Sequence, residues 1–159
     1  MVFSHEGGYV DSPEDLGSVT NLGISLRFYK KRVKPDATKE DIKNLTVNDA
    51  AEIYRRFFWD RQPFESIGSQ KLCDRVFDLH VNCGQGISLL QKAFNAATGL
   101  HLLVDNMLGP KTLDAINAGA TDMIYAELIN QSKLYYKKIA LNNPSQQIFL
   151  KGWLHRLAD

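Results

Sequence analysis

The sequence has only two cysteines, no excess of either charge and no long apolar run, and each shortage excludes a class of protein. Cys73 and Cys83 lie ten residues apart in a stretch with a helical pattern, where a continuous helix keeps them beyond disulfide reach, so we expect two free, buried thiols. The 19 Lys and Arg against 18 Asp and Glu give a formal net charge of +1, which provides no overall attraction to nucleic acid. No window is long and apolar enough to predict a membrane-spanning helix. We therefore expect neither nucleic acid as a partner nor membrane insertion.

Metal ligands and an export signal are also missing from the sequence. The cysteines form no Cys-x-x-Cys pair, and the four histidines lack the spacing of a ligand set: His5, His80, His101 and His155. The start, Met1 to Glu6, lacks the basic and then apolar stretch of a signal peptide. The sequence thus predicts no metal and no cofactor. If the chain is exported, we expect a route that does not use a signal peptide.

The 159 residues are enough for one domain, or for one domain with two lobes that share a helix, and a 44% hydrophobic content can form a real core. From about Leu26 onward most apolar residues recur at intervals of three and four, which predicts a mainly α fold. Only residues 8 to 25 favour strands, because there apolar residues lie among turn formers: Tyr9, Val10, Val19 and Ile24. We expect a small β-hairpin beside a helical body.

Several helices can be outlined in more detail. Thr46 followed by Asp49 predicts a capped helix that ends before Pro63, with one apolar side: Val47, Ala50, Ala51, Tyr54, Phe57 and Phe58. Gly84-Gln85-Gly86 predicts a tight joint between two packed helices, and Gly109-Pro110 predicts a helix start. The segment 121 to 141 predicts a long helix with four residues inward: Ile124, Leu128, Tyr135 and Ile139. A last helix is expected to bury an apolar side that consists of Ile148, Phe149, Trp153 and Leu157.

Residues 5 to 25 concentrate carboxylates and turn formers in one short stretch. Asp15 follows Glu6 by nine residues and Thr20 follows Asp15 by five, while Gly17 and Gly23 supply turns that can fold the loop back toward Glu6. Two carboxyl groups in different environments are what the cleavage of a glycosidic bond requires. This pattern favours Glu6 as the proton donor, Asp15 as an ionised base or stabiliser of positive charge, and Thr20 as a holder of water.

Structural interpretations of the same residues stand beside this one. Glu6 before two glycines is also typical of a solvated carboxylate at a helix end, and Thr20-Asn21 is typical of a turn held by a side-chain bond. Trp59 suits either the core or the edge of a sugar-binding cleft, because its ring is amphipathic. His80 on an apolar helix side favours a core histidine with its hydrogen bonds satisfied. Basic runs at 30–34 and 133–138 are typical of solvated faces, although they would also attract an anionic wall.

The motif Glu6-Gly7-Gly8-Tyr9, followed by Asp15-x-Gly17-x-x-Thr20-Asn21-x-Gly23-Ile24, resembles the opening of glycoside hydrolase family 108. The resemblance implies an N-acetylmuramidase, a lysozyme-type enzyme that cuts peptidoglycan, with Glu6 as its catalytic residue. Similarity to phage-type lysozymes adds Asp15 and Thr20 to the catalytic set. We expect the substrate to contact Tyr9, Asn21 and Trp59. The implied fold is mainly α and lysozyme-like, with a small β or loop lobe and a helical lobe.

Two later stretches, 76–84 and 104–113, resemble the predicted peptidoglycan-binding half that usually follows this domain. We therefore expect a catalytic region at 1–68 and a wall-binding helical lobe at 69–159. The resemblance implies glycan strands of peptidoglycan as the partner. It also implies synthesis in a bacterial or phage-infected cytoplasm, action at the cell wall, and a secretion-activator or endolysin-like role.

Two alternative functions remain open. Where the family often has Asp-Pro-Gly-Gly, this chain has Asp15-Leu16-Gly17-Ser18, which favours a non-catalytic protein that binds the wall or assists secretion. A lytic transglycosylase is the other alternative, since it would need Glu6 alone and would leave an anhydro-muramic end.

Overall fold

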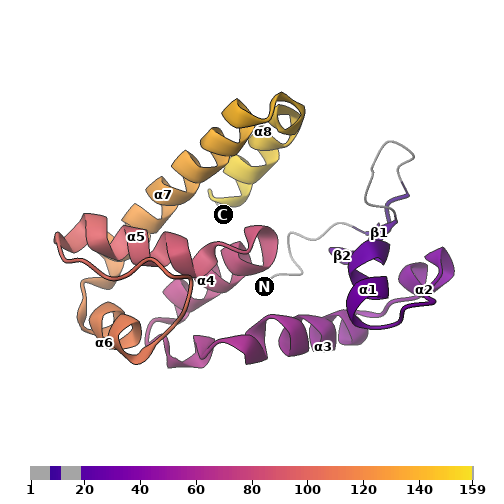
Figure 1. Cartoon of the computed structure of the whole chain (residues 1–159), viewed down its shortest axis with the longest axis horizontal. Coiled ribbons are helices and arrows are strands. Elements are labelled where there is room, and N and C mark those ends of the chain that lie inside the picture. Colours follow the sequence, from indigo (N-terminus) through magenta and orange to yellow (C-terminus); the bar gives the residue numbers. More distant parts are fainter. Residues whose placement is uncertain (1–7, 12–18, 159) are drawn as a thin grey trace. The chain divides into compact units, whose positions relative to one another are not determined.

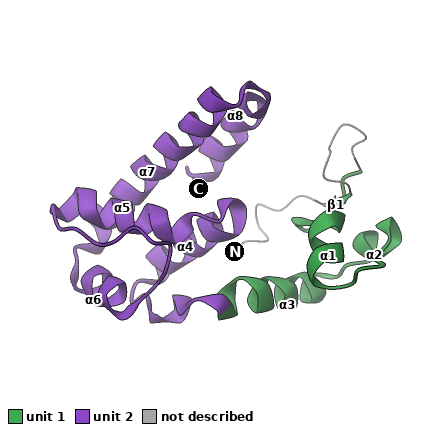
Figure 2. Cartoon of the chain, viewed as in Figure 1, with its two compact units in different colours: residues 1–60 green, residues 61–159 purple. Residues whose placement is uncertain are grey.

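The computed structural model describes residues 8–11 and 19–158, and the predicted catalytic residues Glu6 and Asp15 lie outside these ranges. The chain divides into two compact units, residues 1–60 and residues 61–159 (Figure 2). Both units consist mainly of helices, and a two-stranded sheet lies in the first (Figure 1). The predicted mainly α class is therefore confirmed. Within the described ranges, no helix combines the length and the apolar character needed to cross a membrane.

Unit 1 begins with a hairpin of very short strands, β1 (Thr20–Asn21) and β2 (Ile24–Ser25), which pair antiparallel. An isolated bridge pairs Val10 with Thr20, so a third extended segment lies beside β1. The predicted hairpin within residues 8 to 25 is thus confirmed. Three helices follow: α1 (Leu26–Arg32), α2 (Lys39–Lys43) and α3 (Val47–Phe57), with the 3-10 turn η2 (Trp59–Arg61) after them.

The core of unit 1 lies where the hairpin meets the first two helices, and it consists of Val19, Leu26, Ala37 and Ile42. Two reciprocal side-chain caps define the helix starts nearby. Thr38 and Asp41 cap α2, and Thr46 and Asp49 cap α3, as the sequence predicted for the latter. Each cap satisfies two backbone amides at the start of its helix.

The buried stripe of α3 differs from the predicted one. Ala50, Ile53 and Tyr54 are buried, whereas Val47 is 56% exposed and Ala51 is also exposed. Val47 lies in the first turn, before the part of α3 that packs on its neighbours. The prediction of one apolar side was therefore correct for the middle of the helix and wrong at its start.

The regular elements of unit 2 in the described residues are all helices, joined by loops. They are η3 (Phe64–Ser66), α4 (Gln70–Cys83), α5 (Gly86–Thr98), α6 (Pro110–Ala118), α7 (Thr121–Asn142), η4 (Pro144–Gln146) and α8 (Gln147–Arg156). Helix α5 packs against both α4 and α7. The core consists of fully buried apolar side chains from these helices: Leu72, Val76, Leu79, Ile87, Leu90, Ile124 and Leu128.

The joint between α4 and α5 is tight, as predicted. Gly84 ends α4 with a positive φ of 71°, a conformation that favours glycine. A Cβ on Gly86 would overlap the Val76 carbonyl oxygen and the His80 amide nitrogen, so the two helices approach at a point where only glycine fits. His80 itself corrects a prediction, because its buried Nδ1 has no hydrogen-bond partner among the described residues. Burial lowers the pKa of its imidazole.

The two cysteines are free thiols, which confirms that part of the prediction. Cys73 is buried and its Sγ lies 3.2 Å from the Phe64 carbonyl oxygen, whereas Cys83 is only half-buried. Burial raises the pKa of Cys73 to about 11 and also raises the pKa of Cys83. Both groups are therefore protonated near neutral pH.

The long helix and the last helix each differ from expectation. The buried line of α7 advances by four residues at a time, through Ile124, Leu128, Ser132, Tyr136 and Ala140, so the predicted Tyr135 and Ile139 are only half-buried. In α8 Ile148 is 77% exposed and Phe149 is 49% exposed, which contradicts their predicted burial. The helix instead packs through Trp153, which stacks on Tyr136 at 5.1 Å, and through the buried Leu157 beyond its end.

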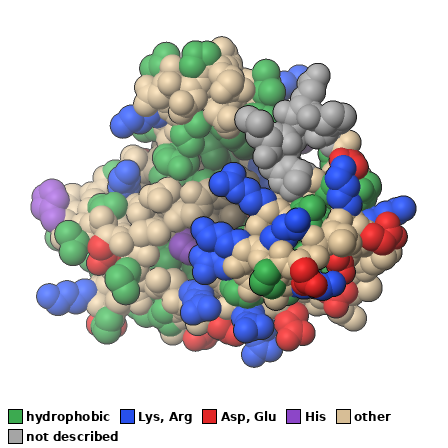
Figure 3. All heavy atoms as spheres, turned by 45° about the vertical axis from the view of Figure 1, so that its right-hand side comes forward, with side chains coloured by type: hydrophobic (Ala, Val, Ile, Leu, Met, Phe, Trp, Pro, Cys, Tyr) green, Lys and Arg blue, Asp and Glu red, His purple; other side chains and the backbone are tan. Residues whose placement is uncertain are grey.

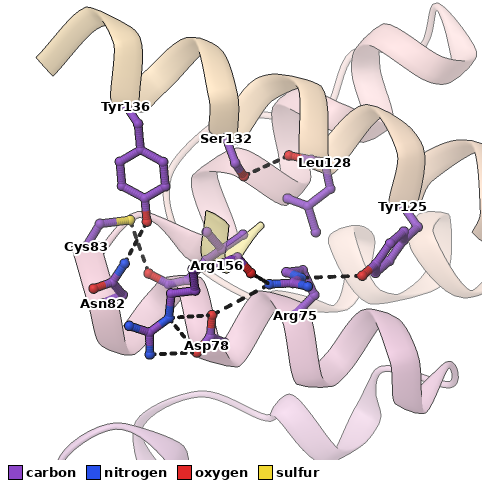
Figure 4. Close-up of polar contacts among 10 residues, drawn as sticks. Arg75, Asp78, Asn82, Cys83, Tyr125, Leu128, Ser132, Tyr136 and Arg156 are labelled. Carbon is purple, nitrogen blue, oxygen red and sulfur yellow. Dashed lines mark hydrogen bonds and ion pairs between the residues drawn. The ribbon is translucent and has the colours of Figure 1, made fainter. Parts of the chain in front are cut away.

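A buried ionic cluster joins α8 to α4 (Figure 4). Arg156 contacts both carboxylate oxygens of Asp78 at 3.2 and 3.3 Å. Arg75 lies 3.8 Å from the same carboxylate and donates to the Arg156 carbonyl oxygen at 2.9 Å. Because Asp78 faces two guanidinium groups, its buried charge is compensated and the C-terminal helix is held to the body of the unit.

Candidate functional site

The described part of the predicted site is the hairpin of unit 1 and the segment before it. Val10 and Thr20 exchange two backbone hydrogen bonds, with N to O distances of 2.8 and 2.9 Å. Thr20 also pairs with Ser25 on its other side, so its backbone is fixed between two extended segments. Val10 follows the Glu6-Gly7-Gly8-Tyr9 motif directly. The chain that leaves the motif is therefore attached to the strand that carries Thr20.

The turn of this hairpin has an uncommon backbone conformation. Leu22 and Gly23 form its two-residue loop, and both have a positive φ, 50° and 75°. Two positive φ values are characteristic of the tight turn whose twist matches paired strands, and Asn-Gly is its preferred sequence. Leu22 is therefore a strained residue at this position. The buried Tyr54 of α3 donates its hydroxyl to the Leu22 carbonyl oxygen at 3.0 Å and holds the turn.

The side chain of Asn21 connects the hairpin to α2. Its side-chain amide donates to the carbonyl oxygens of Ile42 and Lys43 at 3.0 and 3.2 Å, and the residue is buried. These carbonyls belong to the last turn of α2, where helical acceptors lack partners within the helix. The described contacts of Asn21 thus connect β1 to the end of α2.

Both ends of the segment 12–18, which contains Asp15, are attached to unit 1. At one end, the carboxylate of Asp11 accepts from the Lys39 ammonium group at 3.0 and 3.1 Å. At the other end, Val19 is fully buried in the core and its carbonyl oxygen accepts from the Leu26 amide at 2.9 Å. The two residues that border this segment are therefore held in unit 1.

Aromatic side chains connect α1 to α3. Phe28 meets Phe57 edge to face at 5.7 Å and stacks with Phe58 at 5.8 Å, so both α3-end rings serve in packing, as predicted. Trp59 follows at the start of η2 and is half-buried. Tyr9 is 40% exposed beside the Val10–Thr20 bridge. The roles of Tyr9, Asn21 and Trp59 toward a substrate stay predictions.

Sequence patterns missed two long-range contacts of unit 1, from Tyr54 to the hairpin turn at Leu22 and from Lys39 to Asp11. Tyr54 acts across 32 positions and Lys39 across 28, and no local pattern links either to its partner. Tyr54 was assigned to an apolar helix side, which is correct for its ring and incomplete for its hydroxyl. Among residues 8–11 and 19–158, no group of three or more His, Cys, Asp or Glu is arranged to hold a metal ion.

In unit 2 one buried side chain organises the loop between α5 and α6. Gln91 is fully buried and its Oε1 accepts from the backbone amides of Asp105 and Asn106, both at 3.1 Å. Its Nε2 donates to the Asp105 carboxylate at 2.8 Å and to the Met107 carbonyl oxygen at 3.1 Å. Asn106, with a positive φ of 62°, donates through its side chain to the Gly84 carbonyl oxygen at 2.9 Å. The stretch 104–113 therefore has a defined backbone.

The matches to known protein families divide the chain at residue 84, whereas the first compact unit of the structure ends at residue 60. Residues 1–84 match the sequence profile described as glycosyl hydrolase 108, and residues 85–158 match the profile described as predicted peptidoglycan domain. The solved structure of SagA from Brucella abortus is 31% identical and has a TM-score of 0.79, with 99% of this chain and 85% of that chain covered. No curated protein matches the chain in sequence.

These similarities confirm the lysozyme-like fold class that the sequence predicted, with a small sheet and a helical lobe. They also indicate a protein that acts on peptidoglycan at the cell wall. The profile match spans the Glu6-Gly7-Gly8-Tyr9 motif, the hairpin and all of α3, and the structural similarity extends over nearly the whole chain. The chain therefore belongs to the glycosyl hydrolase 108 family, with a predicted peptidoglycan domain in its second half.

Proposed function

We propose that this chain is an N-acetylmuramidase, which hydrolyses the glycosidic bond between N-acetylmuramic acid and N-acetylglucosamine in peptidoglycan. In this proposal residues 1–68 form the catalytic region and residues 69–159 bind the wall. The observation that carries it is the family match over residues 1–84, which contains Glu6 within its Glu-Gly-Gly-Tyr motif. The peptidoglycan domain match over residues 85–158 supports the same substrate.

Glu6 acts as the general acid and gives a proton to the leaving glycosidic oxygen. Asp15 stays ionised and either activates a water molecule or stabilises positive charge on the sugar ring. Thr20 holds the water with its hydroxyl. Water is the second substrate, so one water is consumed for each bond cut and the new muramic end is a reducing end.

The described residues of unit 1 show how the chain next to the proposed catalytic groups is held. The chain leaving the Glu6 motif pairs with Thr20 through Val10, and the segment with Asp15 starts and ends at anchored residues, Asp11 and Val19. The described residues that follow the Glu6 motif and border the Asp15 segment are thus held in unit 1 beside Thr20. The two-carboxylate mechanism of this proposal requires Glu6 and Asp15 to converge on the same bond.

The proposed substrate contacts differ in how the structure supports them. Tyr9 is exposed next to the bridge, which suits contact with a sugar ring, and the half-buried Trp59 has the amphipathic ring that suits the same task. Asn21 is buried and donates to two carbonyl oxygens of α2. We assign Asn21 a positioning role, in which it holds the hairpin that carries Thr20.

Mass analysis of the products tests the reaction type. Purified peptidoglycan treated with the wild-type chain is expected to release fragments with reducing muramic ends, whereas a lytic transglycosylase would release anhydro ends lighter by one water. Asp15→Asn is expected to lower the rate roughly 100-fold, because the second carboxylate assists attack by water. Asp36→Asn, which removes an exposed carboxylate of unit 1, serves as the matched control. Anhydro ends, or an Asp15→Asn rate equal to that of the control, would overturn the proposal.

A further inference from the structure

One side of α1 carries three exposed cations, Arg27, Lys30 and Lys31, which we call the α1 basic face. Their spacing of three and four residues places them on the same side of the helix. The rotation of α1 is fixed from the other side, where Leu26 is buried and Phe28 packs against two aromatic rings of α3. The basic face is therefore directed away from the packed interior of unit 1.

The charges of the α1 basic face are not neutralised by neighbours in the described residues. Three other cations of unit 1 have acidic partners: Lys34 with Asp41 at 2.9 Å, Lys39 with Asp11 at 3.0 Å, and Arg55 with Asp60 at 3.6 Å. Within residues 8–11 and 19–158, no carboxylate lies within ion-pair distance of Arg27, Lys30 or Lys31. Figure 3 shows several exposed Lys and Arg side chains on the face turned toward the viewer, with Asp and Glu side chains beside some of them. Unit 1 thus has a local positive surface although the chain as a whole is nearly neutral.

The α1 basic face is also rigidly connected to the candidate site. Helix α1 begins immediately after β2, and the hydroxyl of Ser25 caps it by accepting from the Phe28 amide at 3.1 Å. The Leu26 amide donates to the Val19 carbonyl oxygen at 2.9 Å, beside the strand that carries Thr20. Seven helical residues span roughly 10 Å, which is about the distance over which charges act at 0.1 M salt. An anion on this face is therefore held near the hairpin.

We propose that the α1 basic face binds carboxylates on the peptide stems of peptidoglycan and so attaches the polymer beside the hairpin. This inference rests on the proposed function in taking peptidoglycan as the substrate. Peptide stems repeat along the glycan, so a strand in contact with the hairpin offers several carboxylates within reach of one helix. The planar guanidinium group of Arg27 can donate two parallel hydrogen bonds to one carboxylate. The ammonium groups of Lys30 and Lys31 can pair with carboxylates in varied orientations.

A matched pair of charge variants tests this surface. The triple variant Arg27→Gln, Lys30→Gln, Lys31→Gln removes the basic face. The control triple variant Lys43→Gln, Arg56→Gln, Arg61→Gln removes the same charge from exposed positions outside α1 and outside the region proposed to bind the wall. Both are made with Glu6→Gln, so that the insoluble peptidoglycan remains whole whether or not the chain is a muramidase. At 0.05 M salt we expect the α1 triple to bind roughly tenfold more weakly, a loss that disappears at high salt, while the control triple binds like its parent.

Chemical blocking of the ligand identifies the group that is bound. Peptidoglycan whose carboxylates have been converted to amides is expected to bind the parent as weakly as it binds the α1 triple. Equal losses in the two triples, no loss in either, or an undiminished α1 effect on amidated peptidoglycan would overturn the proposal. It would also be overturned if the α1 triple lost binding only to vesicles of anionic phospholipid. Thermal unfolding of each variant checks that the fold is intact. Because only binding is measured, α1-dependent binding by a chain that releases no sugar ends would refute the proposed function and leave this inference standing.

Discussion

The hydroxyl of Tyr54 donates to the carbonyl oxygen of Leu22 at 3.0 Å and joins the middle of α3 to the turn of the hairpin. Leu22 occupies a left-handed conformation that a branched apolar residue rarely adopts. The strand before this turn carries Thr20, and its neighbour Asn21 is fastened to α2. The position of Thr20 in unit 1 is therefore supported by hydrogen bonds from two side chains, those of Tyr54 and Asn21.

Replacing Tyr54 by Phe tests how much the turn depends on that hydroxyl. The change leaves the Leu22 carbonyl oxygen without its donor in a partly buried site, so we expect a loss of about 1 kcal/mol in the free energy of unfolding. Urea denaturation measures it, with Tyr29→Phe as a control at a half-buried tyrosine of the same unit. An equal change in the two variants would show that the Tyr54 hydroxyl has no special role.

Asn21→Asp separates positioning from contact with substrate. The aspartate has nearly the same shape and cannot donate to the Ile42 and Lys43 carbonyl oxygens, so a stability loss of about 2 kcal/mol is expected. If Asn21 acts by positioning, the rate of peptidoglycan cleavage falls with the stability of the fold, and Asn21→Ala has a similar effect. An unchanged unfolding free energy with a raised KM would instead indicate direct contact with the glycan.

Gly86→Ala is expected to be the most damaging single methyl addition in unit 2. The new Cβ would overlap backbone atoms of α4, which cannot shift without separating the two helices, so we expect a loss of about 3 kcal/mol or more. Gly152→Ala is the matched control, because a Cβ there meets open space within α8. It should stabilise the chain by about 0.5 to 1 kcal/mol. Comparable thermal midpoints for the two variants would contradict the close helix approach.

The raised pKa values of the cysteines predict slow thiol chemistry. With its pKa raised to about 11 by burial, Cys73 is about one-thousandth thiolate at pH 8, and the thiolate is the form that reacts with iodoacetamide. Cys83 has a raised pKa for the same reason. Mass spectrometry should find both thiols unmodified in the folded chain and rapidly modified in urea. Fast labelling of Cys73 under native conditions would show that it is not buried.

Local patterns predicted the elements of the fold well because local physics determines them. The Thr46–Asp49 cap, the glycine joint at Gly84 and Gly86, and the strands near Thr20 follow from hydrogen bonding and backbone freedom over a few residues. Side-chain burial in α7 and α8 was less predictable. Which apolar residues are covered depends on distant partners, as Trp153 on Tyr136 shows, so Ile148 remains exposed although its sequence pattern suited a core.

For the candidate site, too, the sequence predicted the local features and not the long-range contacts. The residue types of the Glu6 motif and the hairpin were evident from the sequence, and so was the family. The long-range supports were not, because Tyr54 reaches Leu22 and Lys39 reaches Asp11 across about thirty residues, and each looks ordinary in its own helix. Asn21 was predicted to contact substrate, whereas its described hydrogen bonds lie within unit 1. The sequence could suggest its importance but not whether it acts on the glycan or on the fold.

The measurement that tests the central claim most directly is the release of muramic ends from purified peptidoglycan by the wild-type chain, by Glu6→Gln and by Glu14→Gln. Loss of a general acid lowers such rates by roughly 100- to 10,000-fold, whereas Glu14→Gln removes a nearby carboxylate without a proposed role. We predict reducing muramic ends from the wild-type chain and Glu14→Gln, and almost none from Glu6→Gln at equal binding. Equal release by Glu6→Gln, or no release by any of the three while binding persists, would contradict an N-acetylmuramidase that uses Glu6.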